Sequence, residues 1–165
     1  MSVSAILRGM PLCIVIYILA LVFATIRMSY AHDYTSWLAA CKPYRAQVER
    51  ILDEEQASRN YFYLMVAESR CSPRAVSRRG AIGFWQLMPK TSRDYGCINP
   101  HDLTCATRAA ARYLKHLEET FTQFDDIIAA YNMGGHNYRR HGKTRQASGL
   151  IYTVRMLMGA DHDHF

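Results

Sequence analysis

The sequence is poor in the patterns that mark β-sheets, repeats and metal sites. No segment alternates polar and apolar residues over the length of a strand, and no stretch is repeated or of low complexity. No two cysteines have the C-x-x-C spacing typical of zinc sites, and no nucleic-acid recognition motif is present. These absences favour a mainly α fold with little or no β structure, and they predict neither a metal nor another cofactor.

The longest apolar run is shorter than a typical membrane span. From Pro11 to Thr25 it has about fifteen residues, whereas a permanent helical span needs about 18 to 20. Arg8 precedes this run, and Ser-Tyr-Ala ends at Ala31 with small residues where a signal peptidase reads the chain. We predict that residues 1–31 are a signal peptide cleaved after Ala31, and that the protein is periplasmic or secreted without a permanent membrane span. An uncleaved anchor is the lesser alternative.

Acidic residues are the scarcer charged residues. The chain has 20 Lys and Arg against 14 Asp and Glu, and removal of residues 1–31 takes away two arginines, which leaves a formal charge of +4. A mildly basic exported protein suits an acidic polymer, and outside the cytoplasm a cell wall or membrane surface fits better than nucleic acid. The remaining residues are sufficient for one compact domain.

Four cysteines remain after the predicted cleavage: Cys41, Cys71, Cys97 and Cys105. An even number in an exported chain indicates two disulfide bonds, for which three pairings exist. Because Cys97 and Cys105 flank a short loop, we favour a bond between them. Cys41 is then left to pair with Cys71.

Apolar residues at helical spacing predict several helices along the rest of the chain. They cover about residues 34–58, 60–70, 104–121, 125–132 and 149–159. Pro43 should interrupt or start the first helix, Thr104 is a candidate N-cap for the third, and Asp125 should open the fourth. We expect residues 32–58 to form an N-terminal helical extension and residues 59–165 to form the main domain.

One carboxylate lies on the apolar side of a predicted helix. Tyr61, Leu64, Met65 and Glu68 share a face over residues 60–70, and Pro73 ends this helix soon after Glu68. A carboxyl in apolar surroundings has a raised pKa and keeps its proton near neutral pH, which is the condition for a general acid. The alternative is an ordinary ion pair with a nearby arginine. The nearby arginines are Arg70, Arg74, Arg78 and Arg79.

Two stretches around this carboxylate share their motifs with a known family. Residues 67–91 read AESRCSPRAVSRRGAIGFWQLMPKT, and residues 129–134 read AAYNMG. The order of Glu-Ser, Ala-x-Ser, Gly-Ala-x-Gly-x-x-Gln-x-Met-Pro-x-Thr, an alanine-rich helix and Ala-Tyr-Asn-x-Gly resembles the soluble lytic transglycosylase (SLT) domain, a relative of goose-type lysozyme. The resemblance runs from about Tyr61 to His141 and implies a lysozyme-like helical domain with a substrate cleft.

The resemblance also implies a role for each matched residue. Glu68 stands where the family has its catalytic acid and base. Ser77, Gln86, Tyr131 and Asn132 stand where relatives contact the sugar or lie beside the acid. Each of these residue types also occurs in turns, cores and helix caps, so the assignment depends on the motif context.

Two further positions are predicted to contact the substrate. Gly83 should let its loop approach the sugar closely. Tyr152 matches the tyrosine of a Tyr-Val pair in the last helix of relatives, but the acidic residue that usually precedes this pair is absent here. Contacts to the peptide stem of the substrate are therefore left open. The Glu-Ser pair is followed by Arg-Cys-Ser-Pro instead of the usual aromatic residue and Asn-Pro.

The family implies an activity. It is cleavage of the β-1,4 bond between N-acetylmuramic acid and N-acetylglucosamine in peptidoglycan, with a 1,6-anhydro product and no cofactor. Expected partners are peptidoglycan glycan strands and a secretion, conjugation or other envelope-spanning machine, and no nucleic acid. One alternative is a goose-type lysozyme-like hydrolase, for which Asp94 and Asp102 are the nearby candidate second acids. The other is a non-catalytic peptidoglycan-binding assembly factor.

Overall fold

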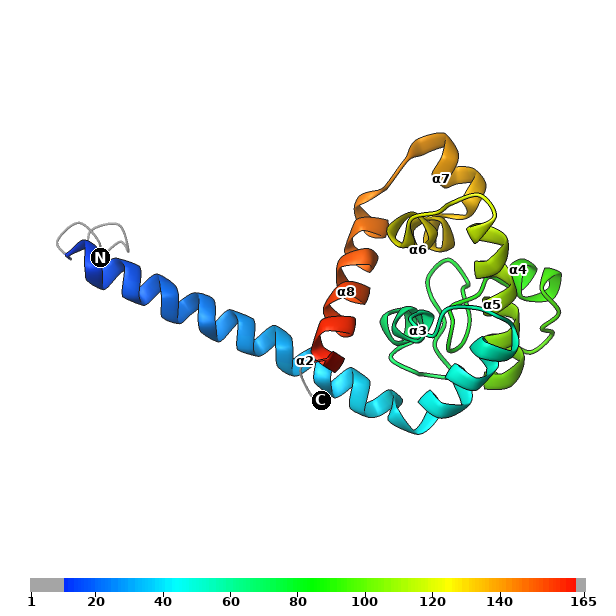
Figure 1. Ribbon diagram of the computed structural model, residues 1–165, viewed down its shortest axis with the longest axis horizontal. Coiled ribbons are helices and arrows are strands. Elements are labelled where there is room, and N and C mark those ends of the chain that lie inside the picture. Colours follow the sequence, from blue (N-terminus) through cyan, green and yellow to red (C-terminus); the bar gives the residue numbers. More distant parts are fainter. Residues whose placement is uncertain (1–10, 163–165) are drawn as a thin grey trace.

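A computed structural model describes residues 11–162, except for the side chains of residues 24–33. In chain order the helices are α2 (Leu12–Glu54), α3 (Tyr61–Ser69), α4 (Pro89–Asp94), α5 (Leu103–Glu118), α6 (Phe124–Met133), α7 (Gly135–His141) and α8 (Arg145–His162) (Figure 1). The described residues contain no strand, and isolated antiparallel bridges join Ile82 to Val76 and to Leu87. The predicted mainly α fold is confirmed.

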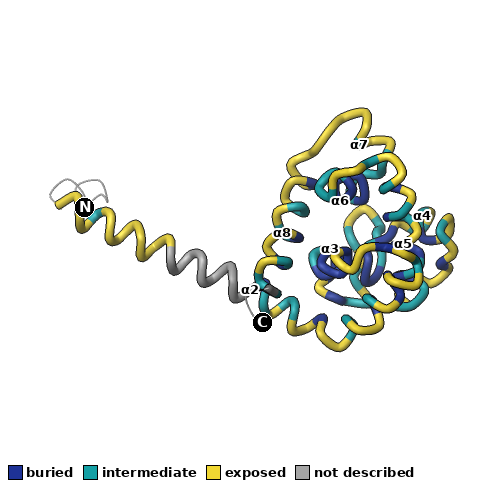
Figure 2. Tube along the Cα trace, viewed as in Figure 1, coloured by how far each residue is buried: buried dark blue, intermediate teal, exposed yellow. Residues whose placement is uncertain are grey.

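Helix α3 lies within the helical domain, surrounded by the other elements (Figures 1 and 2). Its first six residues, Tyr61 to Val66, are all buried, and so is Ser69. A helix that is apolar on every side belongs in a core, and here α2 and α8 pack directly against it. Glu68 therefore lies on the last turn of a buried helix.

Helix α2 continues through Pro43, which was expected to start or interrupt it. Proline lacks the N–H that would bond to the carbonyl four residues earlier, and α2 changes direction within its cyan part (Figure 1). Beyond the proline, Val48 and Leu52 are fully buried in the same core as α3. This packing keeps the helix intact despite the missing hydrogen bond, and the predicted extension over 32–58 contributes side chains to the core of the domain.

The N-terminal part of α2 projects away from the domain (Figure 1). Its apolar side chains face solvent, from Leu12 at 75% exposure to Phe23 at 70%. Residues 1–10 of the predicted signal peptide lie outside the described residues, and the predicted cleavage point after Ala31 falls where side chains are not described. The signal peptide stays a prediction. Over the part of the chain whose side chains are described, no helix has both the length and the apolar composition of a membrane span.

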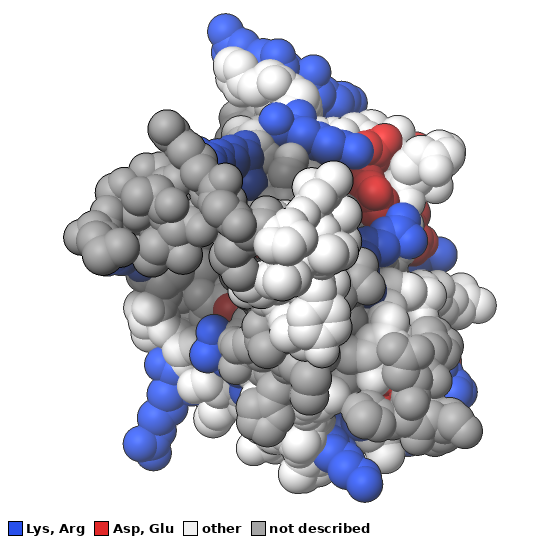
Figure 3. Space-filling model, turned by 90° about the vertical axis from the view of Figure 1, so that its left-hand side faces the viewer, with Lys and Arg blue, Asp and Glu red and all other residues white. Residues whose placement is uncertain are grey.

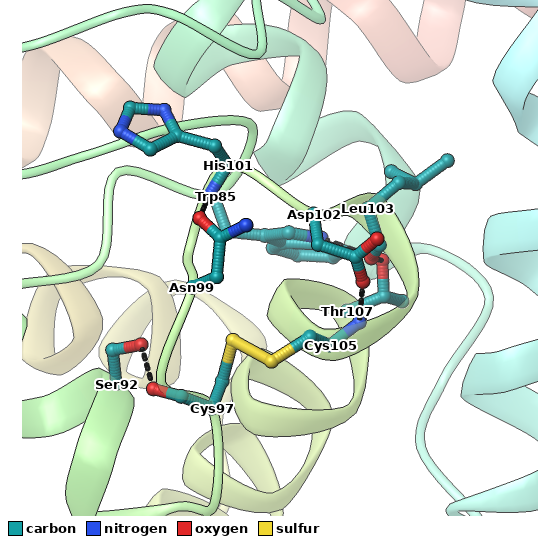
Figure 4. The surroundings of a disulfide bond; sticks show 9 residues. All are labelled: Trp85, Ser92, Cys97, Asn99, His101, Asp102, Leu103, Cys105 and Thr107. Carbon is teal, nitrogen blue, oxygen red and sulfur yellow. Dashed lines mark hydrogen bonds between the residues drawn. A yellow bond between two sulfur atoms is a disulfide. The ribbon is translucent and has the colours of Figure 1, made fainter.

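The caps of two helices differ from expectation. Asp102, and not Thr104, caps α5: its backbone is extended at the helix start and its carboxylate accepts a 2.7 Å hydrogen bond from the Cys105 N–H (Figure 4). Thr104 already lies inside the first turn, where its hydroxyl accepts from Gln47 Nε2 at 2.9 Å. Helix α6 begins one residue before Asp125, without a side-chain cap.

Both disulfide bonds have the favoured pairing. Cys41–Cys71 joins α2 to the residues that follow α3. Cys97–Cys105 joins the loop after α4 to the first turn of α5, and beside it the Ser92 hydroxyl donates to the Cys97 carbonyl at 2.6 Å (Figure 4). The two bonds therefore hold the segment between α3 and α5, which includes α4, at both of its ends.

Loss of the Cys41–Cys71 bond should destabilise the protein more than loss of Cys97–Cys105. The first closes a loop with a sequence separation of 30 and the second one of 8. Loop-closure entropy gives losses of about 3.6 and about 2.5 kcal/mol. Urea unfolding of the two paired Cys→Ala variants checks this order, with the reduced parent protein as control. Equal losses, or the reverse order, would contradict the loop-entropy explanation.

Candidate active site

A pocket of about 300 Å³ opens at the C-terminal end of α3, and Glu68 is one of its lining residues. Helix α3 ends at Ser69 because Arg70 takes a left-handed conformation (φ 52°, ψ 37°) and its N–H donates to the Val66 carbonyl. Glu68 therefore lies on the last turn of a buried helix. Its own side chain faces the pocket and is mostly, although not fully, buried.

The surroundings of Glu68 favour the protonated, uncharged form of its carboxyl. Burial raises the pKa of Glu68 from its ordinary value of 4.5 to about 7, while a hydrogen bond from the Asn132 side chain acts in the opposite direction. No arginine contributes to this shift, and among the described residues none forms an ion pair with Glu68. The Arg70 guanidinium instead lies 4.0 Å from the ring centre of Trp37. The alternative, an ordinary ion pair between Glu68 and a nearby arginine, is therefore absent from the described residues.

Helix α6 brings two predicted residues to the carboxyl. Tyr131 and Asn132 both line the pocket, and α6 ends at Met133, directly after Asn132 and before Gly134, which has a φ of 80°. The Tyr131 hydroxyl donates to the Trp85 carbonyl at 2.8 Å. Tyr131 and Glu68 line the same pocket. Burial raises the pKa of Tyr131, and an ionised Glu68 acts in the same direction, so the phenol stays protonated.

Ser77 lines the pocket from a tight turn. Its hydroxyl accepts the Ala81 N–H at 3.0 Å, and its own N–H donates to the Ala81 carbonyl at 2.9 Å. The hydroxyl hydrogen of Ser77 takes no part in these two bonds. The turn therefore fixes the side chain and leaves one donor for a ligand.

Gln86 lines the pocket with a strained backbone. Its φ is 49°, a left-handed value that is uncommon for a residue other than glycine. The side-chain Nε2 donates to the Ala75 and Gly83 carbonyls at 3.1 and 3.0 Å. Both amide hydrogens are thus engaged, so the side chain can offer a ligand only the acceptor Oε1.

The other two predicted contact residues do not line the pocket. Gly83 packs against the loop after α4, where a Cβ would lie 2.0 Å from the Pro100 carbonyl oxygen, and its φ is 75°. Glycine is required there by this close approach within the protein. Tyr152, on α8, is 59% exposed. A substrate contact for either residue stays a prediction.

Glu68 is the one carboxylate among the described residues that line the pocket. The two candidate second acids have other partners. Asp94 forms a 2.6 Å ion pair with Lys90, and Asp102 caps α5. The site therefore offers a single group that can donate and accept a proton in the range around pH 7.

Sequence reasoning missed several lining residues. Met133 and Gly134 directly follow Asn132, so the AAYNMG motif could have pointed to them. Tyr113 comes from α5, and its ring centre lies 5.4 Å from that of Tyr131. No local pattern marks Tyr113, because only the packing of α5 against α6 brings it to the site.

The family model for the transglycosylase SLT domain matches residues 49–152. The chain belongs to this family. The match includes Glu68 and every residue predicted to contact the substrate, and it begins within the last part of α2. The resemblance seen in the motifs is thus confirmed over residues 49–152.

Two named relatives are similar to the chain over part of their length. A membrane-bound lytic murein transglycosylase D of Escherichia coli (strain K12) is 29% identical over 128 residues, which is 73% of this chain and 28% of that protein. A transglycosylase of Enterobacteria phage PRD1 is 29% identical over 93 residues, 56% of this chain and 35% of that protein. The chain therefore spans well under half the length of these relatives.

Glu68→Gln should reduce the change in the stability of the protein with pH. A carboxyl whose pKa is 4.5 unfolded and about 7 folded binds more protons in the folded state between these values. Stability is then full below the lower value and falls as pH rises through about 7, by up to about 3 kcal/mol. The neutral amide removes this loss, so the stability of the variant relative to the parent should grow between about pH 4 and about pH 8.

Urea unfolding at a series of pH values measures this difference. The matched control is Glu119→Gln, which removes a carboxylate that is 73% exposed and should change the pH dependence of the parent much less than Glu68→Gln does. Parallel curves for the parent and Glu68→Gln would show that the Glu68 carboxyl is already solvated in the folded protein.

Proposed function

We propose that the protein is a peptidoglycan lytic transglycosylase. It cleaves the β-1,4 bond between N-acetylmuramic acid and N-acetylglucosamine and leaves a 1,6-anhydro end on the muramoyl product. The observation that carries this proposal is Glu68, a single carboxyl with a pKa near 7 in a pocket of an SLT domain. The names of the relatives support the reaction class.

In the first step Glu68 acts as the acid. Its carboxyl protonates the glycosidic oxygen while the bond from that oxygen to C1 breaks. Because the pKa of Glu68 is near 7, much of the protein still carries this proton around neutral pH. Ser77 and Gln86 offer one donor and one acceptor at the pocket wall, which can orient the sugar.

In the second step Glu68 acts as the base. The C6 hydroxyl of the muramoyl residue closes on C1, a C1–O6 bond replaces the glycosidic bond, and Glu68 takes the hydroxyl proton. No water is consumed, and the carboxyl returns to its starting state. Glycosidases that use water commonly have a second carboxylate beside the bond, whereas a nucleophile within the substrate is already in place. The hydrogen bond from Asn132 stabilises the carboxylate between the two steps.

The alternatives fit the pocket less well. A goose-type lysozyme-like hydrolase needs a group to activate water, and neither Asp94 nor Asp102 lines the pocket. A non-catalytic peptidoglycan-binding assembly factor gains nothing from a desolvated carboxyl, which lowers stability at neutral pH and above.

We also propose that the protein acts in the cell envelope after export. Two disulfide bonds suit an oxidising compartment, and the predicted signal peptide over 1–31 supplies the route. Local wall remodelling, or insertion of an envelope-spanning machine, is the proposed role. Within the mature chain we keep residues 59–165 as the proposed catalytic domain and residues 32–58 as its helical extension.

Digestion of purified peptidoglycan should give fragments with anhydro ends. Mass spectrometry distinguishes them, because an anhydro end is one water molecule lighter than a reducing end. The parent protein should release anhydro fragments, and Glu68→Gln should release none while keeping its circular dichroism spectrum. Reducing ends would indicate hydrolysis, and equal release by Glu68→Gln would refute the role of the carboxyl.

The rate should fall with rising pH in a way that depends on Asn132. Since the first step needs protonated Glu68, kcat/KM should decline above about pH 7, by about tenfold per pH unit. Asn132→Ala removes the hydrogen bond that lowers the pKa of Glu68, so the decline should move to higher pH. The control is Asn137→Ala, an exposed α7 residue whose side chain donates to the Met133 carbonyl. An unmoved decline in Asn132→Ala would show that Asn132 does not act through Glu68.

A further inference from the structure

A second pocket adjoins the candidate active site and has no part in the reaction proposed above. It also has a volume of about 300 Å³, and its lining residues come from α4, α5, α7 and the segments between them. Thr91 and Tyr113 line both pockets. A molecule that occupies the active site can therefore extend into the second pocket without leaving the protein surface.

A row of three tyrosine rings connects the two pockets. The ring centre of Tyr113 lies 5.4 Å from that of Tyr131 in the first pocket and 5.2 Å from that of Tyr95 in the second. The Gly135 backbone lies near the Tyr113 hydroxyl. The row gives a bound chain a continuous, partly apolar floor between the two pockets.

The second pocket has an excess of basic groups. Arg139, His116 and His136 line it, and the one carboxylate among its described lining residues is Asp94. The charge of Asp94 is offset by its 2.6 Å ion pair with Lys90. Arg139 is exposed and has no ion-pair partner among the described residues, whereas His116 lies 3.3 Å from Glu119. Arg139 is therefore the cation available to a ligand.

The surface around α7 is also rich in basic side chains. Lys and Arg side chains project from the upper edge of the molecule in Figure 3, the edge at which α7 lies in Figure 1. The last turn of α7 holds Arg139, Arg140 and His141 in succession. An anionic group is attracted to this edge before it reaches the pocket.

We propose that the second pocket binds a carboxylate of the peptide that peptidoglycan carries on the lactyl group of its muramoyl residue. The proposal rests on the proposed function. A muramoyl ring held beside Glu68 carries its peptide through the lactyl group, so the peptide begins near a pocket that shares Thr91 and Tyr113 with the active site. A carboxylate matches the guanidinium of Arg139, whereas a further N-acetylated sugar has no charge to match it.

The test compares strands with and without the peptide. One substrate is a preparation of peptidoglycan strands with their peptides, and the other is the same strands after an amidase has hydrolysed the bond to the peptide, which leaves a free carboxylate on each lactyl group. Arg139→Gln should raise KM about fivefold on the peptide-bearing strands, because an exposed ion pair contributes modestly, and leave KM on the bare strands unchanged. The parent should also lose its preference for peptide-bearing strands as salt increases.

Arg140→Gln is the matched control. Arg140 is the next residue of α7, is exposed, and lines neither pocket, so the same change of charge should leave both KM values unchanged. An equal rise on both substrates in Arg139→Gln would show that the pocket binds the glycan or its lactyl carboxylate and not the peptide. No rise on either would show that it binds nothing the reaction needs. Failure of the proposed function looks different, since the parent protein would then release anhydro ends from neither substrate.

Discussion

The removal of one carboxyl from water is the interaction on which the rest of the structure depends. Helix α3 is buried along nearly its whole length, and Glu68 lies on its last turn, where the negative end of the helix dipole disfavours a charged carboxylate as burial does. An isolated carboxyl would be solvated and have a pKa near 4.5. The packing of α2 and α8 against α3 prevents this, so the fold supplies the energy that keeps the proton on Glu68.

The loop that follows α3 has to hold its shape with little secondary structure of its own. Cys71 and Gln86 both have positive φ, and such residues persist only where their surroundings fix them. Three contacts do this: the Cys41–Cys71 bond, the close approach of Gly83 to Pro100, and a 2.6 Å hydrogen bond between His101 Nδ1 and the Pro73 carbonyl. The Cys97–Cys105 bond in turn closes the loop that carries Pro100 and His101 (Figure 4). The loop after α3 forms one wall of the pocket, and contacts outside the pocket therefore fix its conformation.

Much of this site could be predicted from the sequence because its main signals are local. Glu68 stands in an apolar helical pattern, and Tyr131 and Asn132 stand together in one short motif. The features that the sequence does not reveal depend on tertiary contact. Tyr113 reaches the pocket only because α5 packs on α6, and Gly83 faces Pro100, a residue of a different loop. Pro43 remains inside α2 for the same reason, since the packing of Val48 and Leu52 outweighs one missing hydrogen bond.

A single residue that must first give a proton and then take one back works best when its pKa is near the pH of its surroundings. Burial alone would leave the carboxylate that Glu68 forms in the first step poorly stabilised. The formation of this carboxylate, and with it the base of the second step, would then be disfavoured. Asn132 corrects this, since its amide hydrogen bond favours the charged form that burial disfavours. The balance of the two sets a pKa of about 7, and it depends on α6 placing Asn132 beside the end of α3. The geometry between these two helices therefore tunes the chemistry.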